Sequence, residues 1–340
     1  MGKADIESRK YMRDTAHFAD VVNYYVFGGR QIVRPDDLTP LDTAEVVIPY
    51  GNGARFPVQK YRDTVKLWSA MTDEKVVYVI LGAENQTEVH YAMPVRSGLY
   101  DFLNYSGQVS EAGKRYRKKT QKENGSAIRL TSGEYLSGFR KEDKLIPVIT
   151  LVVFFSNTEW DGPMTIHEML NTQDRQILDL VQDYKIHLVA PAGIPDEDFI
   201  KFRTDLGPVL QFIKYSDDKD KLDEAKNNID RFRRMNPESV ELINAVTGSD
   251  LKIVVNEEGK VDVCKAINEM RSESRNEGRI EGKIEGRREG RIEGRREGKI
   301  EGSLETLVHL VQKGLLSLCD AATEANLTPD EFTLKMKEFT

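Results

Sequence analysis

Two carboxylates and one carboxamide stand in two β-forming segments that are close neighbours in the sequence. Asp63 lies in the first segment, 61–68, and Glu84 and Gln86 close the second, 76–86. A short, mostly polar stretch separates the segments, so the sequence predicts a β-hairpin. Because side chains alternate along a strand, Glu84 and Gln86 share one side, where Asp63 would complete a cluster of oxygen atoms. Such a cluster suits Mg²⁺, which takes one or two carboxylates from a protein and keeps several waters.

A metal ion held in this way can activate water and stabilise the charge that develops when a phosphodiester bond is hydrolysed. We therefore expect Asp63 and Glu84 to be the metal ligands. Gln86 carries no charge, so its carboxamide is expected to orient the attacking water or a ligand through hydrogen bonds. These residue types together predict metal-dependent hydrolysis of phosphodiesters.

The order of these residues resembles a known family. An Asp, a hairpin and then Glu-x-Gln is similar to the core of the PD-(D/E)XK nucleases. It resembles in particular the recombination-promoting nuclease and transposase-like family, in which Gln occupies the usual place of Lys. Segments 18–27, 84–96 and 133–155 resemble that family's first helix, its central motif and the strand after its second helix. The resemblance covers the first half of the chain and weakens beyond about residue 215.

The resemblance implies an α/β fold with a PD-(D/E)XK-like mixed central sheet flanked by helices. It also implies a Mg²⁺-dependent DNA endonuclease associated with recombination or mobile elements. A further acid on the first helix completes many sites of this family, which implies Asp20 as a catalytic residue, and spacing does not separate it from Asp14 or Glu7. Because Gln86 lacks the charge of Lys, the alternative is a catalytically impaired DNA-binding or interaction protein that retains the fold.

Basic residues near the predicted site are candidates for binding DNA phosphates. The net charge of the chain is −7, so a protein that coats nucleic acid through bulk charge is disfavoured, and local clusters matter more. The segment 114–122 has six basic residues and one tyrosine, and a solvated loop is its alternative interpretation. The predicted nucleic-acid contacts are Arg96, Lys114, Arg115, Arg117, Lys118 and Lys119.

Composition limits the cellular setting and the kind of site. The two cysteines, Cys264 and Cys319, form no CxxC pair, which favours a reducing cytosol over a disulfide framework. The five histidines lack the spacing of a zinc site. No apolar run approaches about 18 residues, and the first residues do not resemble a secretory signal. We therefore expect a cytoplasmic protein without a membrane span.

Hydrophobic periodicity predicts the elements that must position the site. Helical spacing of apolar residues predicts helices in most of the region from 196 to 247, whereas continuous apolar runs predict strands. The predicted helices are 11–27, 94–109, 196–206, 209–215, 219–235 and 237–247, and the predicted strands outside the hairpin are 45–50, 145–155 and 184–190. A small hairpin is predicted between 251–255 and 260–263.

Four regions follow from these patterns. The nuclease-like core is predicted at 1–195, and a helical annex with the small hairpin at 196–272. The segment 273–302 is a charged low-complexity repeat with Gly at every fourth position, for which a flexible linker is the main interpretation and pairing with a second copy the alternative. A small helical module at 303–340 has a weak helix-turn-helix resemblance, and self-association or docking is an equal alternative. DNA and a second copy of the chain are therefore the expected partners.

Overall fold

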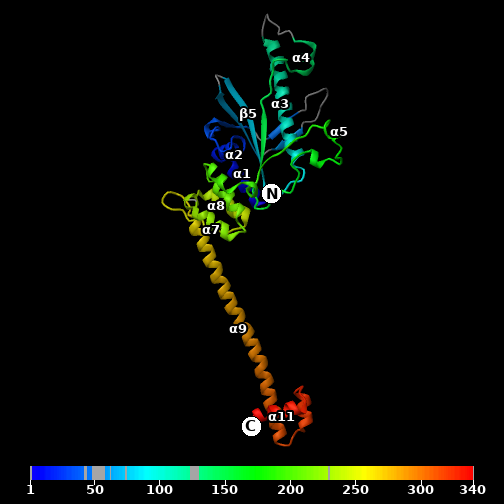
Figure 1. Ribbon diagram of the computed structural model, residues 1–340, viewed down its shortest axis with the longest axis vertical. Coiled ribbons are helices and arrows are strands. Elements are labelled where there is room, and N and C mark those ends of the chain that lie inside the picture. Colours follow the sequence, from blue (N-terminus) through cyan, green and yellow to red (C-terminus); the bar gives the residue numbers. More distant parts are fainter. Residues whose placement is uncertain are drawn as a thin grey trace. The chain divides into compact units, whose positions relative to one another are not determined.

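The computed structural model describes residues 2–41, 44–47, 58–61, 63–72, 75–122, 130–228 and 230–339. The chain forms two compact units, Met1–Ile267 and Asn268–Thr340, which are described separately below. Figure 1 shows the elements of each unit along the sequence. No helix among the described residues is both long and apolar enough to cross a membrane.

A mixed five-stranded sheet forms the centre of the first unit. Its strand order is β1-β4-β5-β6-β7, with β1–β4 and β4–β5 antiparallel and β5–β6 and β6–β7 parallel. The protein is therefore an α/β protein with an open mixed sheet, as predicted. The strands are β1 (Leu38–Pro40), β4 (Thr64–Thr72), β5 (Lys75–Gln86), β6 (Val148–Phe154) and β7 (His187–Val189).

The predicted hairpin is confirmed as β4 and β5, which pair from Thr64 with Ala83 to Thr72 with Lys75. The predicted strand 145–155 is β6, whose apolar residues are almost all buried because it is an interior strand. The predicted strand 45–50 is only partly described. Its first residues belong to β2 (Ala44–Val47), which pairs with β3 (Val58–Tyr61) in a separate two-stranded sheet, and 48–50 lie outside the described residues.

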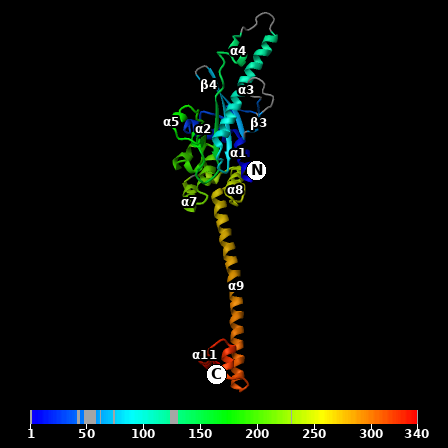
Figure 2. The ribbon, with the colours of Figure 1, turned by 90° about the vertical axis from the view of Figure 1, so that its right-hand side faces the viewer.

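Helices pack on both faces of the large sheet. On one face α3 (Met93–Lys122) packs through Tyr105 against a cluster of buried apolar residues, Val65, Ile80 and Val148, and Figure 2 shows α3 running along the sheet. On the other face Lys66 Nζ donates a hydrogen bond to the carbonyl oxygen of Arg13 at 2.8 Å and lies 5.0 Å from the ring centre of Phe18. The first two helices therefore cover the face opposite to α3.

The predicted helix 11–27 is wrong as a single element. The structure has α1 (Lys3–Arg13) and α2 (Thr15–Phe27), separated at Asp14. The Asp14 carboxylate accepts hydrogen bonds from the backbone N–H groups of Ala16 (2.7 Å) and His17 (3.2 Å), so it caps the second helix instead of continuing the first. The helix then ends at Gly28, whose φ of 63° is left-handed.

Helix α3 is longer than its predicted range of 94–109, and it includes the basic segment that was considered as a loop. Two of its glycines, Gly98 and Gly113, are sites of close approach. A Cβ atom on Gly98 would lie 3.3 Å from Cγ of Tyr184, so the ring packs directly on the helix backbone. Gly113 in turn lies against the backbone of Gly138, where a Cβ would come within 3.3 Å of the carbonyl oxygen. These contacts hold both halves of the helix.

The helical region after the sheet belongs to the same unit as the sheet. Helix α8 (Pro237–Thr247) packs on α1, where the hydroxyl groups of Tyr11 and Ser239 lie 3.1 Å apart. The predicted helices 196–206 and 219–235 are each shorter in the structure, and the predicted hairpin near 255 is reduced to an isolated bridge between Val255 and Val261. The described helices here are η4 (Asp196–Lys201), α6 (Leu206–Lys214), α7 (Lys219–Asn228) and η5 (Asp230–Arg233).

Short helices connect the larger elements of the first unit. These connecting helices are η1 (Pro35–Asp37), α4 (Ser132–Ser137), η2 (His167–Met169), α5 (Arg175–Leu178) and η3 (Pro191–Gly193). Two of them, α4 and α5, have a side-chain N-cap: Thr131 accepts the N–H of Glu134 while the Glu134 carboxylate accepts the N–H of Thr131, and Asp174 accepts the N–H of Gln176.

The glycine repeat lies within one long helix, α9 (Val263–Gln312), where the main interpretation predicted a flexible linker. Glu, Arg and Lys are good helix formers and no proline interrupts the segment, which favours helix despite the glycines. In the second unit the end of α9 packs with α10 (Leu318–Glu324) and α11 (Pro329–Glu338). Their shared core is Leu307, Val308, Ala321, Ala322 and Phe332.

Candidate active site at the open end of the β4–β5 hairpin

Asp63 lies immediately before β4, opposite the last residues of β5. Its side chain is 2% exposed. One carboxylate oxygen, Oδ2, accepts a hydrogen bond from the backbone N–H of Asn85 at 2.9 Å, and the other, Oδ1, lies 2.9 Å from Nε of Arg9 on α1. The carboxylate is therefore fixed between the end of one strand and the first helix.

Glu84 reaches the same region from β5. Residues 80, 84 and 86 share one face of the strand, and Ile80 shows that this face packs under α3. Glu84 is completely buried, and its Oε2 lies 3.0 Å from Nη2 of Arg96 in the first turn of α3. Gln86 is half-buried and donates its Nε2 to the carbonyl oxygen of Asn85 at 3.1 Å.

The two carboxylates share the electrostatic influence of Arg96. Burial alone would lower the pKa of Arg96, but the pKa is raised because Glu84, Tyr100 and Asp63 favour the charged guanidinium. Burial raises the pKa of Asp63, while the Asn85 N–H, Arg9 and Arg96 act in the opposite direction. One partly buried cation thus interacts electrostatically with both of the acids that the sequence singled out.

Helix α1 adds two residues to this site that were not identified from the sequence. Asp5 and Arg9 are four residues apart and so lie on the same helix face. Asp5 Oδ1 accepts a hydrogen bond from the hydroxyl group of Thr87 at 2.8 Å, which lowers the pKa of Asp5, and its charge raises the pKa of Asp63. The available signal was this four-residue spacing of an acid and a base, which is common on surface helices and therefore weak.

Asp20 does not join the site, which corrects the expectation that it is the acid of the first helix. It lies on α2, is 2% exposed, and accepts the backbone N–H groups of Arg203 (2.9 Å) and Thr204 (2.8 Å) and the Thr204 hydroxyl (2.7 Å). It therefore anchors the loop before α6. The two alternatives are also occupied elsewhere, since Asp14 caps α2 and Glu7 pairs with Lys10.

The predicted phosphate-binding residues are divided by the structure. Arg96 is within the site and is paired with Glu84. Lys114 is exposed and pairs with Glu111 at 2.7 Å, and Arg115 is exposed on the same helix. The remaining three, Arg117, Lys118 and Lys119, belong to α3, but their side chains lie outside the described residues.

A buried polar network under α3 holds the helix that provides Arg96. Asp101 is 5% exposed and accepts hydrogen bonds from the hydroxyl groups of Thr150 on β6 and Tyr184, each at 2.6 Å. Charge-assisted hydrogen bonds of this kind are short and strong. Because Arg96, Gly98 and Asp101 share the start of α3, this network and the packing of Tyr184 on Gly98 fix the position from which Arg96 reaches Glu84.

The donor types fit a hard divalent cation. Among the described residues no group of three or more His, Cys, Asp or Glu side chains could hold a metal ion. Two carboxylates are nevertheless what Mg²⁺ takes from many proteins, with water in its other positions. Asp63 and Glu84 are the residues that would hold the ion, and it would compete with Arg9 and Arg96 for their oxygen atoms.

Comparison with known proteins returned no family model, no curated protein and no solved structure that matches this chain.

Proposed function

We propose that the protein is a divalent-metal-dependent DNA endonuclease that hydrolyses phosphodiester bonds. The observation that carries the proposal is that Asp63, just before β4, and Glu84, near the end of β5, are placed by adjacent strands and both interact electrostatically with Arg96, which pairs with Glu84 at 3.0 Å. The resemblance of the hairpin and its Glu-x-Gln motif to recombination-promoting nucleases of the PD-(D/E)XK class supports it. On that resemblance its biological setting is recombination or a mobile element, in the cytoplasm.

Each residue of the site has a distinct role in this proposal. A bound Mg²⁺ would supply a Lewis acid and a water of lowered pKa. Asp63 and Glu84 hold the ion, and Gln86 orients the attacking water through its carboxamide. Gln86 stands where related nucleases have a positively charged Lys. Arg96 supplies that positive charge within the same site, and it stabilises the charge that develops on the phosphate oxygens. The DNA backbone is held by Arg96 and the basic residues of α3.

A second candidate is DNA binding without cleavage, and one observation favours it. Both carboxylates are already paired with arginines, at 2.9 Å for Asp63 and 3.0 Å for Glu84. An acid that is neutralised by a guanidinium attracts a cation less than a free one does. In this alternative the two ion pairs stabilise a retained nuclease fold, and the basic helix provides the function.

A plasmid-nicking assay separates the two candidates. We expect the full-length protein to nick supercoiled plasmid with 5–10 mM Mg²⁺ or Mn²⁺, roughly the range in which weakly held ions saturate their sites, and not with EDTA. Asp63→Asn and Glu84→Gln should lose activity, whereas the exposed loop variant Glu257→Gln, prepared identically, should retain it.

Each result of this assay supports a different conclusion. Equal nicking by all four proteins would show a contaminating nuclease and would remove support for the endonuclease. A wild-type protein that binds a fluorescent DNA duplex in an anisotropy titration but never nicks it would select the non-catalytic alternative. Loss of nicking in a variant counts only if its circular dichroism spectrum matches that of the wild type.

Self-association through the C-terminal region is part of the same proposal. In α9 the side chains of Ile280, Ile284, Ile292 and Ile300 are 53–62% exposed, which is unusual for isoleucine on a helix. Light scattering on the full chain and on a variant with these four residues changed to Ser tests it. A wild type that remains monomeric at high micromolar concentration would contradict it.

A further inference from the structure

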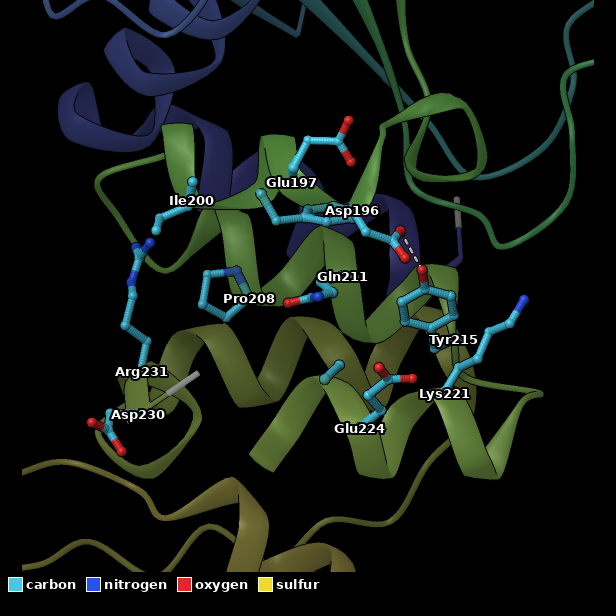
Figure 3. A pocket seen from close by; sticks show the side chains of 12 residues that line it. Asp196, Glu197, Ile200, Pro208, Gln211, Tyr215, Lys221, Glu224, Asp230 and Arg231 are labelled. Atoms are coloured by element: carbon cyan, nitrogen blue, oxygen red, sulfur yellow. Dashed lines mark hydrogen bonds between the residues drawn. The ribbon is translucent and has the colours of Figure 1, made fainter. Parts of the chain in front are cut away.

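A second feature of the first unit, unrelated to the hairpin, is a cavity between η4, α6, α7 and η5 (Figure 3). Its volume is about 650 Å³, which lies within the range of small-molecule binding sites. The inner wall includes Phe199, Pro208, Tyr215 and Ala225, all of them buried. The cavity is therefore apolar at its base and large enough for a molecule of two or three fused or linked rings.

One polar side chain is directed into this apolar space. Gln211 is the single polar residue of the run 206–213, which is otherwise Leu, Gly, Pro, Val, Phe and Ile. It is 5% exposed, and Figure 3 shows its carboxamide in the cavity between the two helix layers. Within the part of the chain that the structure describes, its Oε1 has no hydrogen-bond partner. Buried polar atoms nearly always have a partner, so this oxygen indicates a ligand that donates a hydrogen bond.

The charged residues around the opening indicate which ligand charge the cavity favours. Glu197, Glu224 and Asp230 are exposed carboxylates that line the cavity. Arg231 also lines it, and its guanidinium donates to the carbonyl oxygens of Phe202 (2.8 Å) and Thr204, which hold it in place but leave its positive charge. The potential at the opening is therefore dominated by carboxylates, which attract a cation and repel an anion.

A fourth acid that lines the cavity, Asp196, is already neutralised and does not change this conclusion. Asp196 accepts hydrogen bonds from Nζ of Lys214 at 2.7 Å and from the hydroxyl group of Tyr215, and these lower its pKa. Lys221 is exposed at the opening, with its Nζ 5.7 Å from the Tyr215 ring centre. Among the described lining residues, Glu197, Glu224 and Asp230 carry three negative charges against the two positive charges of Lys221 and Arg231, so the opening is net negative by one charge.

We infer that this cavity binds a small, largely apolar molecule with an N–H donor, neutral or cationic, such as an amine or an N–H heterocycle. The apolar wall takes the rings, Oε1 of Gln211 accepts the N–H, and the carboxylates at the opening favour a protonated amine. The inference does not depend on DNA cleavage, since no residue of the hairpin site contributes to the cavity.

Four related probes test this chemistry on the full-length protein by ligand-observed NMR titration. Tryptamine has an N–H ring and a cationic amine, indole has only the N–H ring, benzothiophene has no donor, and indole-3-acetate carries a negative charge. The expected order of affinity is tryptamine, then indole, then benzothiophene, with indole-3-acetate weakest. Gln211→Leu should weaken tryptamine and indole by about tenfold, the effect of one neutral hydrogen bond, and leave benzothiophene unchanged.

A surface variant tests the charge without touching the interior. Glu224→Lys at the opening should weaken tryptamine and strengthen indole-3-acetate by about threefold each, as expected for a screened charge reversal at an exposed position. Glu257→Lys makes the same charge change on an exposed loop outside the cavity and should change neither affinity.

The thermal midpoint of ligand-free Gln211→Leu provides an independent check. If Oε1 lacks a partner, replacing Gln by the similarly sized Leu should leave the midpoint unchanged or raise it. A fall of several degrees would show that Gln211 supports the fold and would overturn the inference. Failure of all four probes to bind at millimolar concentration, or tryptamine binding that Gln211→Leu leaves intact, would overturn it as well.

Discussion

Two buried carboxylates of the first unit, Asp20 and Asp63, are almost equally inaccessible but are satisfied in different ways. Asp20 accepts backbone and hydroxyl hydrogens of Arg203 and Thr204, at distances of 2.7–2.9 Å. Asp63 accepts one backbone hydrogen, from Asn85, and otherwise depends on the long side chain of Arg9. A carboxylate enclosed by fixed neutral donors has little freedom to exchange them, whereas an arginine can withdraw and leave its oxygen to another cation. Burial alone therefore does not distinguish a structural acid from a candidate ligand, but the nature of the partner does.

The largest expected difference between the two kinds of acid is in activity. Glu84→Gln should reduce plasmid nicking by about 10³-fold because it removes a ligand of the proposed ion, and Asp63→Asn should act similarly. Asp20→Asn should retain nicking when the rate is normalised to the folded fraction. Nicking rates and circular dichroism of the three variants check this. Loss of specific activity in a folded Asp20→Asn protein would remove the distinction.

A smaller effect is expected when the cation is removed instead of the acid. Arg96→Met leaves Glu84 buried without its paired cation, which should lower the free energy of unfolding by about 3 kcal/mol. Mg²⁺ should restore part of that loss in the variant and have less effect on the wild type, because the ion would replace the missing charge. Urea unfolding with and without Mg²⁺ measures both quantities. A variant that is destabilised but indifferent to Mg²⁺, Mn²⁺ and Ca²⁺ would contradict a metal site here.

Removing the structural acid should affect stability alone. Asp20→Ala leaves the N–H groups of Arg203 and Thr204 without their acceptor, for an expected loss of about 2 kcal/mol in the free energy of unfolding. Mg²⁺ should not restore it. Urea unfolding is the measurement, with Asp250→Asn at an exposed position as the control that should be unchanged. Recovery of Asp20→Ala by Mg²⁺ would place this acid in the ion site after all.

The smallest expected effect concerns how the free energy of unfolding depends on pH, to which Asp63 and Asp5 should contribute in opposite ways. The pKa of Asp63 is raised from 3.8, so above that pH the folded protein binds more protons than the unfolded chain, and stability falls as the pH rises through this window. The pKa of Asp5 is lowered from 3.8, so its contribution is present above that value and is lost as the pH falls through the folded pKa. Asp63→Asn and Asp5→Asn should therefore change the slope of stability against pH in opposite directions, measured by urea unfolding from pH 2 to 6. Slopes that change in the same direction would show that the two acids share one environment.

The parts of this molecule that could be predicted from the sequence are those that neighbouring residues determine. The β4–β5 hairpin follows from two β-forming runs and a short turn, and the interior strand β6 follows from its apolar run. Alternation along β5 was sufficient to place Glu84 and Gln86 on one side. In each case the physical cause acts over a few residues.

The misplaced and missed residues depend on contacts between distant segments. Asp20 looked like a site acid because it lies on an early helix, but its partners are 183 and 184 residues further along the chain. Arg9 and Asp101 likewise acquire their roles only when the helices pack on the sheet, and Gln211 is notable only because no described residue gives its cavity-facing oxygen a partner. No local pattern carries this information.

The contact between Gly98 and Tyr184 has a consequence for engineering. Helix propensity favours alanine over glycine at an internal helical position by about 1 kcal/mol, so a search for stabilising substitutions in α3 would choose residue 98 early. A methyl group there would meet the ring at 3.3 Å and push on the tyrosine whose hydroxyl group holds Asp101. A gain in helix propensity and the arrangement that positions Arg96 would then compete at a residue that has no side chain.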